Sequence, residues 1–151
     1  MSKDCIEVSV YGEKNYRLFL DVIKQELVSS GCEEITSTQA LILLNINENV
    51  VTTGEVITKG YYIGSNASYN VKKLVNAGYL TSVQSDYDKR TILLKLTEKG
   101  LQLCDRINKS LDTHMNKAEK VSKSKLDMKV GLGFMKNLER FWNDVLRNRE
   151  D

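Results

Sequence analysis

Hydrophobic residues recur at helical spacing near both ends of the chain. Towards the N-terminus, the apolar positions follow i, i+3, i+4, i+7 and i+11: Tyr16, Phe19, Leu20, Ile23 and Leu27. A similar stripe lies towards the C-terminus: Phe134, Leu138, Phe141, Trp142 and Val145. Stripes of this kind are typical of amphipathic helices that bury one face. The pattern therefore predicts a long helix near each end, and Gly31 stands where a glycine commonly ends the first.

Two shorter helices are predicted next from their capping residues. Thr36 or Ser37 can cap a helix that runs to Ile46 through mostly apolar positions. After a short polar link, Thr52 is followed three residues later by Glu55, the spacing of a capping box. This predicts a brief third helix.

The segment from residue 65 to residue 96 changes from helical to strand periodicity. Residues 65–77 have the spacing of a fourth helix, and a glycine follows it. Residues 79–83 and 91–96 are rich in strand-forming side chains and are separated by the polar stretch 84–90, which predicts a β-hairpin. Thr97 then caps a long fifth helix.

This order of elements predicts a mainly α (α+β) fold. Four helices, two strands and two further helices (α-α-α-α-β-β-α-α) have the arrangement of a winged helix-turn-helix with additional helices at both ends. We expect residues 36–100 to form the DNA-binding lobe. Residues 1–35 and 101–151 would form a helical region whose long helices could supply a dimer interface.

Composition excludes several classes of protein. The 151 residues contain no proline and are 41% hydrophobic, as expected for a globular, helical chain. No apolar run approaches the roughly 18 residues of a membrane span, and no signal-peptide core follows the start, so a cytoplasmic protein without membrane contact is expected. Three cysteines, Cys5, Cys32 and Cys104, form no CxxC pair and indicate neither a disulfide framework nor a metal site.

Charge is distributed unevenly along the chain. Residues 1–50 hold four Lys/Arg and eight Asp/Glu, whereas residues 52–95 hold six and three. A positive middle segment favours a polyanionic partner such as double-stranded DNA.

The fourth helix has two different faces. One face is apolar, and the other carries two amides, a phenol and an ammonium: Asn66, Tyr69, Asn70 and Lys73. A solvated polar face is the commoner explanation for such a stripe taken alone. Because the second short helix of a helix-turn-helix enters the major groove, we interpret this face as a DNA-reading surface.

Chemistry supports that interpretation. Each asparagine offers a donor and an acceptor, for which adenine is the best match, and Tyr69 can contact a phosphate or a thymine methyl. Lys72 and Lys73 can neutralise phosphates. Ser65 can add its hydroxyl to the helix N-terminus.

The hairpin tip contains a second candidate contact. Asp88 and Arg90 are two residues apart, so in an extended segment they share a face and the carboxylate can orient the guanidinium. Arg90, with Lys89 beside it, could then enter a narrow minor groove. A plain exposed ion pair is an equally good explanation of this spacing alone.

These residues resemble the MarR family of winged helix-turn-helix regulators. The resemblance is carried by Asp88-x-Arg90 followed by Leu96-Thr97-x-x-Gly100, and by Leu74-Val75-x-x-Gly78-Tyr79-Leu80. The segment from Gly60 to Asn70 also resembles the alphaproteobacterial LdtR-like branch, linked to cell-wall L,D-transpeptidase and stress genes.

The resemblance implies a homodimer on a pseudo-palindromic operator, without a cofactor, whose affinity for DNA changes when a small amphipathic or phenolic effector binds. By position, Arg90 would be the minor-groove arginine and Asp88 its orienting partner. Candidate residues for the effector pocket are Phe19, Leu43, Leu103 and Ile107, although such apolar residues more often belong to the core.

Two alternatives keep the fold and change the role. The domain could be a protein-interaction module without operator specificity. It could instead be a redox-sensing repressor that uses Cys104 or Cys32, although Glu33 and Glu34 beside Cys32 disfavour a thiolate. An enzyme is not expected, because the single histidine, His114, has no catalytic motif around it and no phosphate-binding or metalloprotease motif is present.

Overall fold

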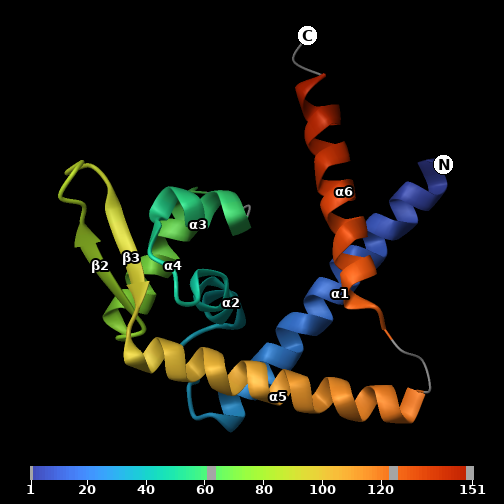
Figure 1. Ribbon diagram of the computed structural model, residues 1–151, viewed down its shortest axis with the longest axis horizontal. Helices are drawn as coiled ribbons and strands as arrows, with labels where there is room; N and C mark the ends of the chain where they lie inside the picture. Colours follow the sequence, from blue (N-terminus) through green and yellow to red (C-terminus); the bar gives the residue numbers. More distant parts are fainter. Residues whose placement is uncertain (1, 61–63, 123–125, 149–151) are drawn as a thin grey trace. The chain divides into compact units, whose positions relative to one another are not determined.

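The computed structural model describes residues 2–60, 64–122 and 126–148, with only the backbone described for Ser2, Gly64, Ser65 and Ser122. Nine elements follow one another along the chain (Figure 1): α1 (Ser2–Ser29), α2 (Ser37–Ile46), β1 (Val51–Thr52), α3 (Thr53–Gly60), α4 (Gly64–Asn76), β2 (Leu80–Gln84), β3 (Ile92–Leu96), α5 (Glu98–Ser122) and α6 (Met128–Arg147). The predicted fold class is confirmed. The chain divides into two compact units, one up to Leu111 and one from Asp112, so that α5 belongs to both.

The N-termini of the short helices are capped as the sequence predicts. Thr36 caps α2, and its hydroxyl accepts from the backbone N–H of Gln39 at 3.2 Å. The Thr52 hydroxyl accepts from the N–H of Glu55 at 3.1 Å, and the Glu55 carboxylate accepts from the N–H of Thr52 at 2.6 Å. Each capping box satisfies two backbone donors that the helix leaves unpaired, which fixes where the helix begins.

Two glycines end helices in the left-handed conformation. Gly31 has φ of +66° after α1, and Gly78 has φ of +79° after α4. After each glycine, the next residue bonds back to the last turn of the helix. The N–H of Cys32 donates to the Leu27 carbonyl, and the N–H of Tyr79 donates to the Leu74 carbonyl, both at 2.9 Å. A glycine accepts this φ without strain.

The sheet has one strand more than the sequence predicts. Its order is β1-β3-β2, with all pairs antiparallel. The hairpin registers Leu80 with Leu96 and Gln84 with Ile92. Val51 pairs with Leu94 to add β1, so the expectation of a two-stranded ribbon is wrong. A strand of two residues has too short a pattern to be recognised, and it exists here because β3 offers a free edge.

The core of the first unit joins every element from α1 to the first half of α5. Its largest fully buried side chains are Tyr79, Ile23, Ile42, Leu43, Ile46, Leu74, Leu94, Leu103 and Ile107. Gly100 shows how closely α5 approaches the end of α4, because an added Cβ there would collide with the Tyr79 carbonyl. The glycine of the L-T-x-x-G motif is thus required by the packing of α5 against the segment that follows α4.

None of the helices among the described residues is long and apolar enough to cross a membrane.

Candidate nucleic-acid interface

Helix α4 separates a buried apolar face from an exposed polar one. Ala67 and Leu74 are completely buried and Val71 nearly so, and they hold the helix against the core. On the other side, Asn66 and Tyr69 are exposed, and Tyr69 keeps 60% of its surface accessible. The core therefore supports the polar face rather than covering it.

Lysines continue the polar face of α4. Lys72 and Lys73 are exposed, and the Nζ of Lys73 lies 5.6 Å from the centre of the Tyr69 ring. A cation over an aromatic face is a favourable arrangement, so it places the ammonium beside the phenol. The side chain of Ser65, the remaining predicted contact on this helix, lies outside the described residues.

Asn70 differs from its neighbours on this face because it is only half exposed. Its Oδ1 accepts a hydrogen bond of 3.1 Å from Nε2 of Gln39, a residue of α2 that is 5% exposed. Helices α2 and α4 are therefore joined by a polar bond at the edge of the exposed polar face of α4.

The loop between β2 and β3, here called the wing tip, differs from the prediction that the Asp88 carboxylate orients the Arg90 guanidinium. Among the described residues, no ion pair joins Asp88 to the Arg90 guanidinium. Its carboxylate instead accepts from the Arg90 backbone N–H and from the Thr91 hydroxyl, both at 3.0 Å. The reason is local geometry: the chain bends at residues 86–87 and turns at residues 89–90 instead of running extended, so Asp88 and Arg90 do not share a face. Asp88 shapes the loop, and the Arg90 side chain projects from it exposed.

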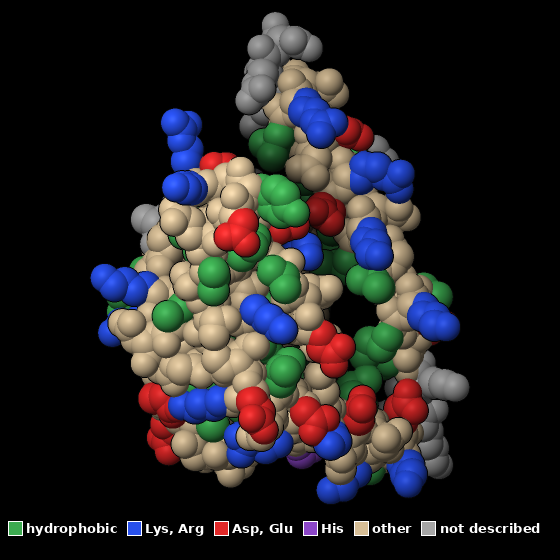
Figure 2. All heavy atoms as spheres, turned by 60° about the vertical axis from the view of Figure 1, so that its left-hand side comes forward, with side chains coloured by type: hydrophobic (Ala, Val, Ile, Leu, Met, Phe, Trp, Pro, Cys, Tyr) green, Lys and Arg blue, Asp and Glu red, His purple; other side chains and the backbone are tan. Residues whose placement is uncertain are grey.

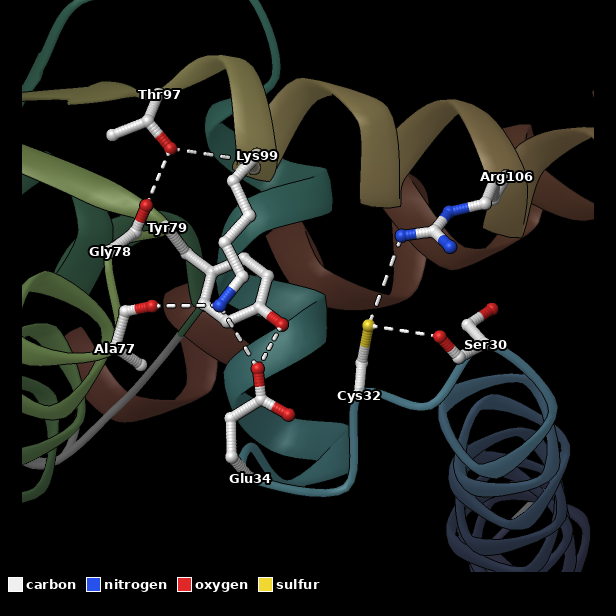
Figure 3. A network of polar contacts seen from close by, with 10 residues as sticks. Ser30, Cys32, Glu34, Ala77, Gly78, Tyr79, Thr97, Lys99 and Arg106 are labelled. Atoms are coloured by element: carbon white, nitrogen blue, oxygen red, sulfur yellow. Dashed lines mark hydrogen bonds and ion pairs between the residues drawn. The ribbon is translucent and has the colours of Figure 1, made fainter.

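A second polar cluster anchors the C-terminal end of α4 (Figure 3). The Tyr79 hydroxyl donates to Glu34 Oε1 at 2.5 Å, and Lys99 Nζ binds the same oxygen at 3.1 Å and the Ala77 carbonyl at 3.0 Å. Lys99 also lies 4.1 Å above the centre of the Tyr79 ring. The cluster ties α4 to the α1–α2 loop and to α5.

These contacts shift two pKa values in opposite directions. The hydrogen bond from Tyr79 is the main reason that the pKa of Glu34 lies below its ordinary value, with Lys99 adding to the effect. Burial, followed by the bond to Glu34, raises the pKa of Tyr79 far above its ordinary value. At neutral pH the phenol is therefore a fixed donor to a carboxylate.

Figure 2 shows the charge on one face of the molecule. Lys and Arg side chains project at the upper left and the left edge of this view, and acidic side chains form a row near the bottom, with others in the upper half.

Comparison with known proteins identifies the family. A family model described as a winged helix DNA-binding domain matches residues 35–100. The exopolysaccharide II synthesis transcriptional activator ExpG of Rhizobium meliloti (strain 1021) is 30% identical over 135 residues, which cover 89% of this chain and 70% of ExpG. Among solved structures, MarR from E. coli (apo form) is 19% identical with a TM-score of 0.60, over 91% of this chain and 96% of that one. The chain belongs to the MarR family of transcriptional regulators.

A second MarR-family structure has the same fold. FabT of Streptococcus pneumoniae, solved in complex with DNA, is 22% identical with a TM-score of 0.68, over 92% of this chain and 97% of that one. The prediction that the chain is not an enzyme is confirmed by its membership of a family of regulators. The resemblance to the LdtR-like branch stays a prediction, and residues 61–63 of its segment lie outside the described residues.

The candidate residues for the effector pocket of this MarR-family chain differ in burial. Leu43, Leu103 and Ile107 are buried in the central cluster, and Phe19 is 38% exposed. The burial of these three residues agrees with a core role, and the effector pocket itself stays a prediction.

The cysteines differ in their suitability as redox sensors. Burial raises the pKa of Cys104 to about 11, which disfavours the thiolate at neutral pH. Cys32 is also buried, but its sulfur lies 3.9 Å from a guanidinium nitrogen of Arg106 and 3.5 Å from the Ser30 carbonyl oxygen (Figure 3). Of the two candidates, Cys32 therefore has the more polar surroundings.

Two residues at or beneath the candidate interface were missed from the sequence. Gln39 was not singled out, although Thr36-x-x-Gln39 is itself a capping-box pattern that marks this glutamine as a residue with a structural partner. Tyr87 at the wing tip is fully exposed, which no local pattern indicated.

Proposed function

We propose that this MarR-family regulator acts as a homodimer on a pseudo-palindromic DNA operator, with α4 in the major groove and the β2–β3 wing at the minor groove. The exposed polar face of α4, held rigid by its buried face, is the observation that carries the proposal. A regulator that read no sequence would need only positive charge on this face, yet two amides and a phenol stand there.

Side-chain chemistry on α4 supports major-groove reading. Asn66 and Asn70 can hydrogen-bond base edges, and Tyr69 reaches out from the same face. Lys72 and Lys73 are available for phosphates, whose neutralisation supplies most of the salt-dependent affinity. Because α4 contains no arginine, a bidentate guanine contact from this helix is not part of the proposal.

The wing supports a second contact through Arg90. The loop that carries it is held by Asp88 and by a hydrogen bond from the Gln84 amide to the Lys89 carbonyl. An arginine on a defined projecting loop can enter a narrow minor groove, where the negative potential is enhanced. Lys89 would add a phosphate contact.

Unpaired apolar surfaces support the homodimer. The first half of α1 exposes Ile6, Val10 and Tyr11, and α6 has no buried residue among those described. Phe141 and Trp142 of α6 pack edge to face at 5.1 Å between ring centres and still expose 50% and 40% of their surfaces. Apolar patches of this kind commonly mark protein interfaces. A second copy with the same patches satisfies them by symmetry.

Regulation by a small amphipathic or phenolic effector belongs to the proposal through the family resemblance, as does control of cell-wall and stress genes. An action on DNA would place the protein in the bacterial cytoplasm.

Selection of bound duplexes from random sequence tests this function directly. The expected result is an enriched motif with two half-sites related by a dyad and roughly one helical turn apart. The matched comparison is Lys72→Ala, which should weaken binding to all duplexes alike and leave the motif unchanged. Binding without an enriched motif would contradict operator specificity, and a lack of binding to any duplex would favour the protein-interaction module.

A further inference from the structure

A chain of hydrogen bonds runs from the backbone of α2 to the polar face of α4. The backbone N–H of Thr36 donates to Gln39 Oε1 at 3.0 Å. The other end of the same amide, Gln39 Nε2, donates to Asn70 Oδ1 at 3.1 Å. Gln39 is 5% exposed, so water cannot easily replace either partner.

The orientation of both amides follows from the first bond. Oxygen and nitrogen of an amide side chain look alike and are assigned from their partners. A backbone N–H is only a donor, so the atom of Gln39 that faces Thr36 must be the oxygen. The nitrogen of Gln39 then faces Asn70, and a nitrogen of this kind only donates. The atom of Asn70 that meets it must therefore be Oδ1, which leaves Nδ2 as the end available to a ligand.

We propose that Gln39 is a positioning residue that sets the base preference of Asn70 without touching DNA. The inference rests on the proposed function, and it adds a base preference for one contact of α4. Gln39 occupies one lone pair of Oδ1 and turns this oxygen towards α2, so Nδ2 is the end of Asn70 that is left to face a ligand. Such a donor selects a base edge that carries acceptors in the major groove, such as O6 and N7 of guanine or O4 of thymine. The bidentate contact to adenine expected from the sequence needs both ends of the amide to face the base, and the bond from Gln39 to Oδ1 disfavours that orientation at Asn70. Asn66 retains that possibility.

The contrast between these two asparagines makes the proposal specific. They lie one helical turn apart on the same face, but Asn66 is exposed whereas Asn70 is half buried and bonded to α2. A substitution that reverses the hydrogen bond at Asn70 should thus change the base preference at one position of the operator half-site. The base preference at the position that Asn66 reads should stay the same.

Gln39→Glu reverses this bond. A carboxylate still accepts from the Thr36 N–H, so the helix cap is retained, but it offers Asn70 an acceptor in place of a donor. The Asn70 amide should turn, donate through Nδ2 and expose Oδ1. An exposed acceptor prefers a donor edge, such as N4 of cytosine.

Base selection from random duplexes measures the change. Asn70→Ala first locates the position, because its preference there should disappear. At that position the wild-type chain should favour guanine or thymine over cytosine, and Gln39→Glu should reverse the order, with a change of about fivefold or more in the guanine-to-cytosine ratio. The double variant Gln39→Glu, Asn70→Ala should match Asn70→Ala in base preference. A general loss of affinity from the added negative charge would leave the ratio unchanged, so the ratio separates the two effects.

A second variant avoids the buried position in case Gln39→Glu does not fold. In Asn70→Asp, one carboxylate oxygen accepts from Gln39 Nε2 and the other is exposed, so the same shift towards cytosine is expected. Asn66→Asp is the matched control and should alter a different position. An unchanged guanine-to-cytosine ratio in both Asn70→Asp and Gln39→Glu, or a motif that Asn70→Ala leaves intact, overturns the role of Gln39. A wild-type chain that enriches no motif contradicts the proposed function itself.

Discussion

Helices α4 and α6 are both amphipathic, yet they use their two faces in opposite ways. The 13-residue α4 buries its apolar face in its own chain and exposes a polar one. The 20-residue α6 has no buried residue among those described, and its exposed side chains include Val130, Phe134 and Met135. A helix held by its own core can present a fixed polar surface, as proposed here for DNA, whereas a helix with an open apolar face needs further packing to be stable, as proposed here for a second copy.

The largest effect should come from the buried face of α4. Leu74→Ala removes a fully buried side chain and is expected to lower the free energy of unfolding by about 2–5 kcal/mol. Chemical denaturation at several protein concentrations would measure it, and the loss should be the same at each. Asn66→Ala on the exposed face of the same helix is the control, expected to change stability by less than about 0.5 kcal/mol. A comparable loss from both substitutions would show that α4 is not divided as described.

The next effect concerns the open face of α6. Trp142→Asp places a charge among exposed aromatic and aliphatic residues and should weaken dimerisation by about 2 kcal/mol or more, roughly 30-fold, because buried aromatic anchors dominate most interfaces. Sedimentation over a range of concentrations would measure the dissociation constant.

The control for this substitution is Lys136→Ala, which alters a charged residue of the same helix. A wild-type chain that sediments as a monomer at micromolar concentration would contradict the homodimer. A Trp142→Asp variant that dimerises normally would instead move the interface away from this part of α6.

A smaller effect is expected at the wing. Arg90→Ala should weaken operator binding more than tenfold, about 1.4 kcal/mol or more, while the dimer stays folded, because the side chain is exposed and makes no core contact. Electrophoretic mobility shift would measure the affinity. Arg90→Lys retains the charge without the planar guanidinium, so it separates groove insertion from general attraction to phosphate. Unchanged affinity for Arg90→Ala would remove the wing from the interface.

The features predicted correctly from the sequence are those determined by neighbouring residues. Caps at Thr36, Thr52 and Thr97, and glycines at 31 and 78, depend on bonds that span three to five positions. Hydrophobic spacing located the helices for the same reason, since the apolar period reports the local geometry directly.

The features missed or mistaken depend on partners distant in sequence or on turn geometry. Strand β1 exists only because β3, about 40 residues later, accepts it as a neighbour. Gln39 and Asn70 are 31 residues apart, and neither residue alone indicates the bond. Asp88 was assigned to the Arg90 guanidinium by assuming an extended segment, but the loop turns and brings the carboxylate to the backbone instead.

The smallest effect tests how the end of α4 is anchored. Glu34→Gln keeps an acceptor for the Tyr79 hydroxyl but removes the charge that Tyr79 and Lys99 stabilise. Because the Glu34 side chain is 44% exposed, water screens the pair, and the free energy of unfolding at pH 7 should fall by only about 1 kcal/mol.

The effect of Glu34→Gln should depend on pH. The pKa of Glu34 is lowered in the folded protein, so the contribution of its charge to stability is complete above the ordinary pKa of 4.5 and disappears as pH falls through the folded value. Thermal unfolding of both proteins between pH 7 and pH 3 should therefore show two curves that converge in acid. Glu33→Gln, at the exposed neighbouring position, should follow the wild-type curve throughout. Curves that stay parallel down to pH 3 would mean that the charge of Glu34 does not hold α4, and that the Tyr79 hydrogen bond and the packing around Gly100 are sufficient.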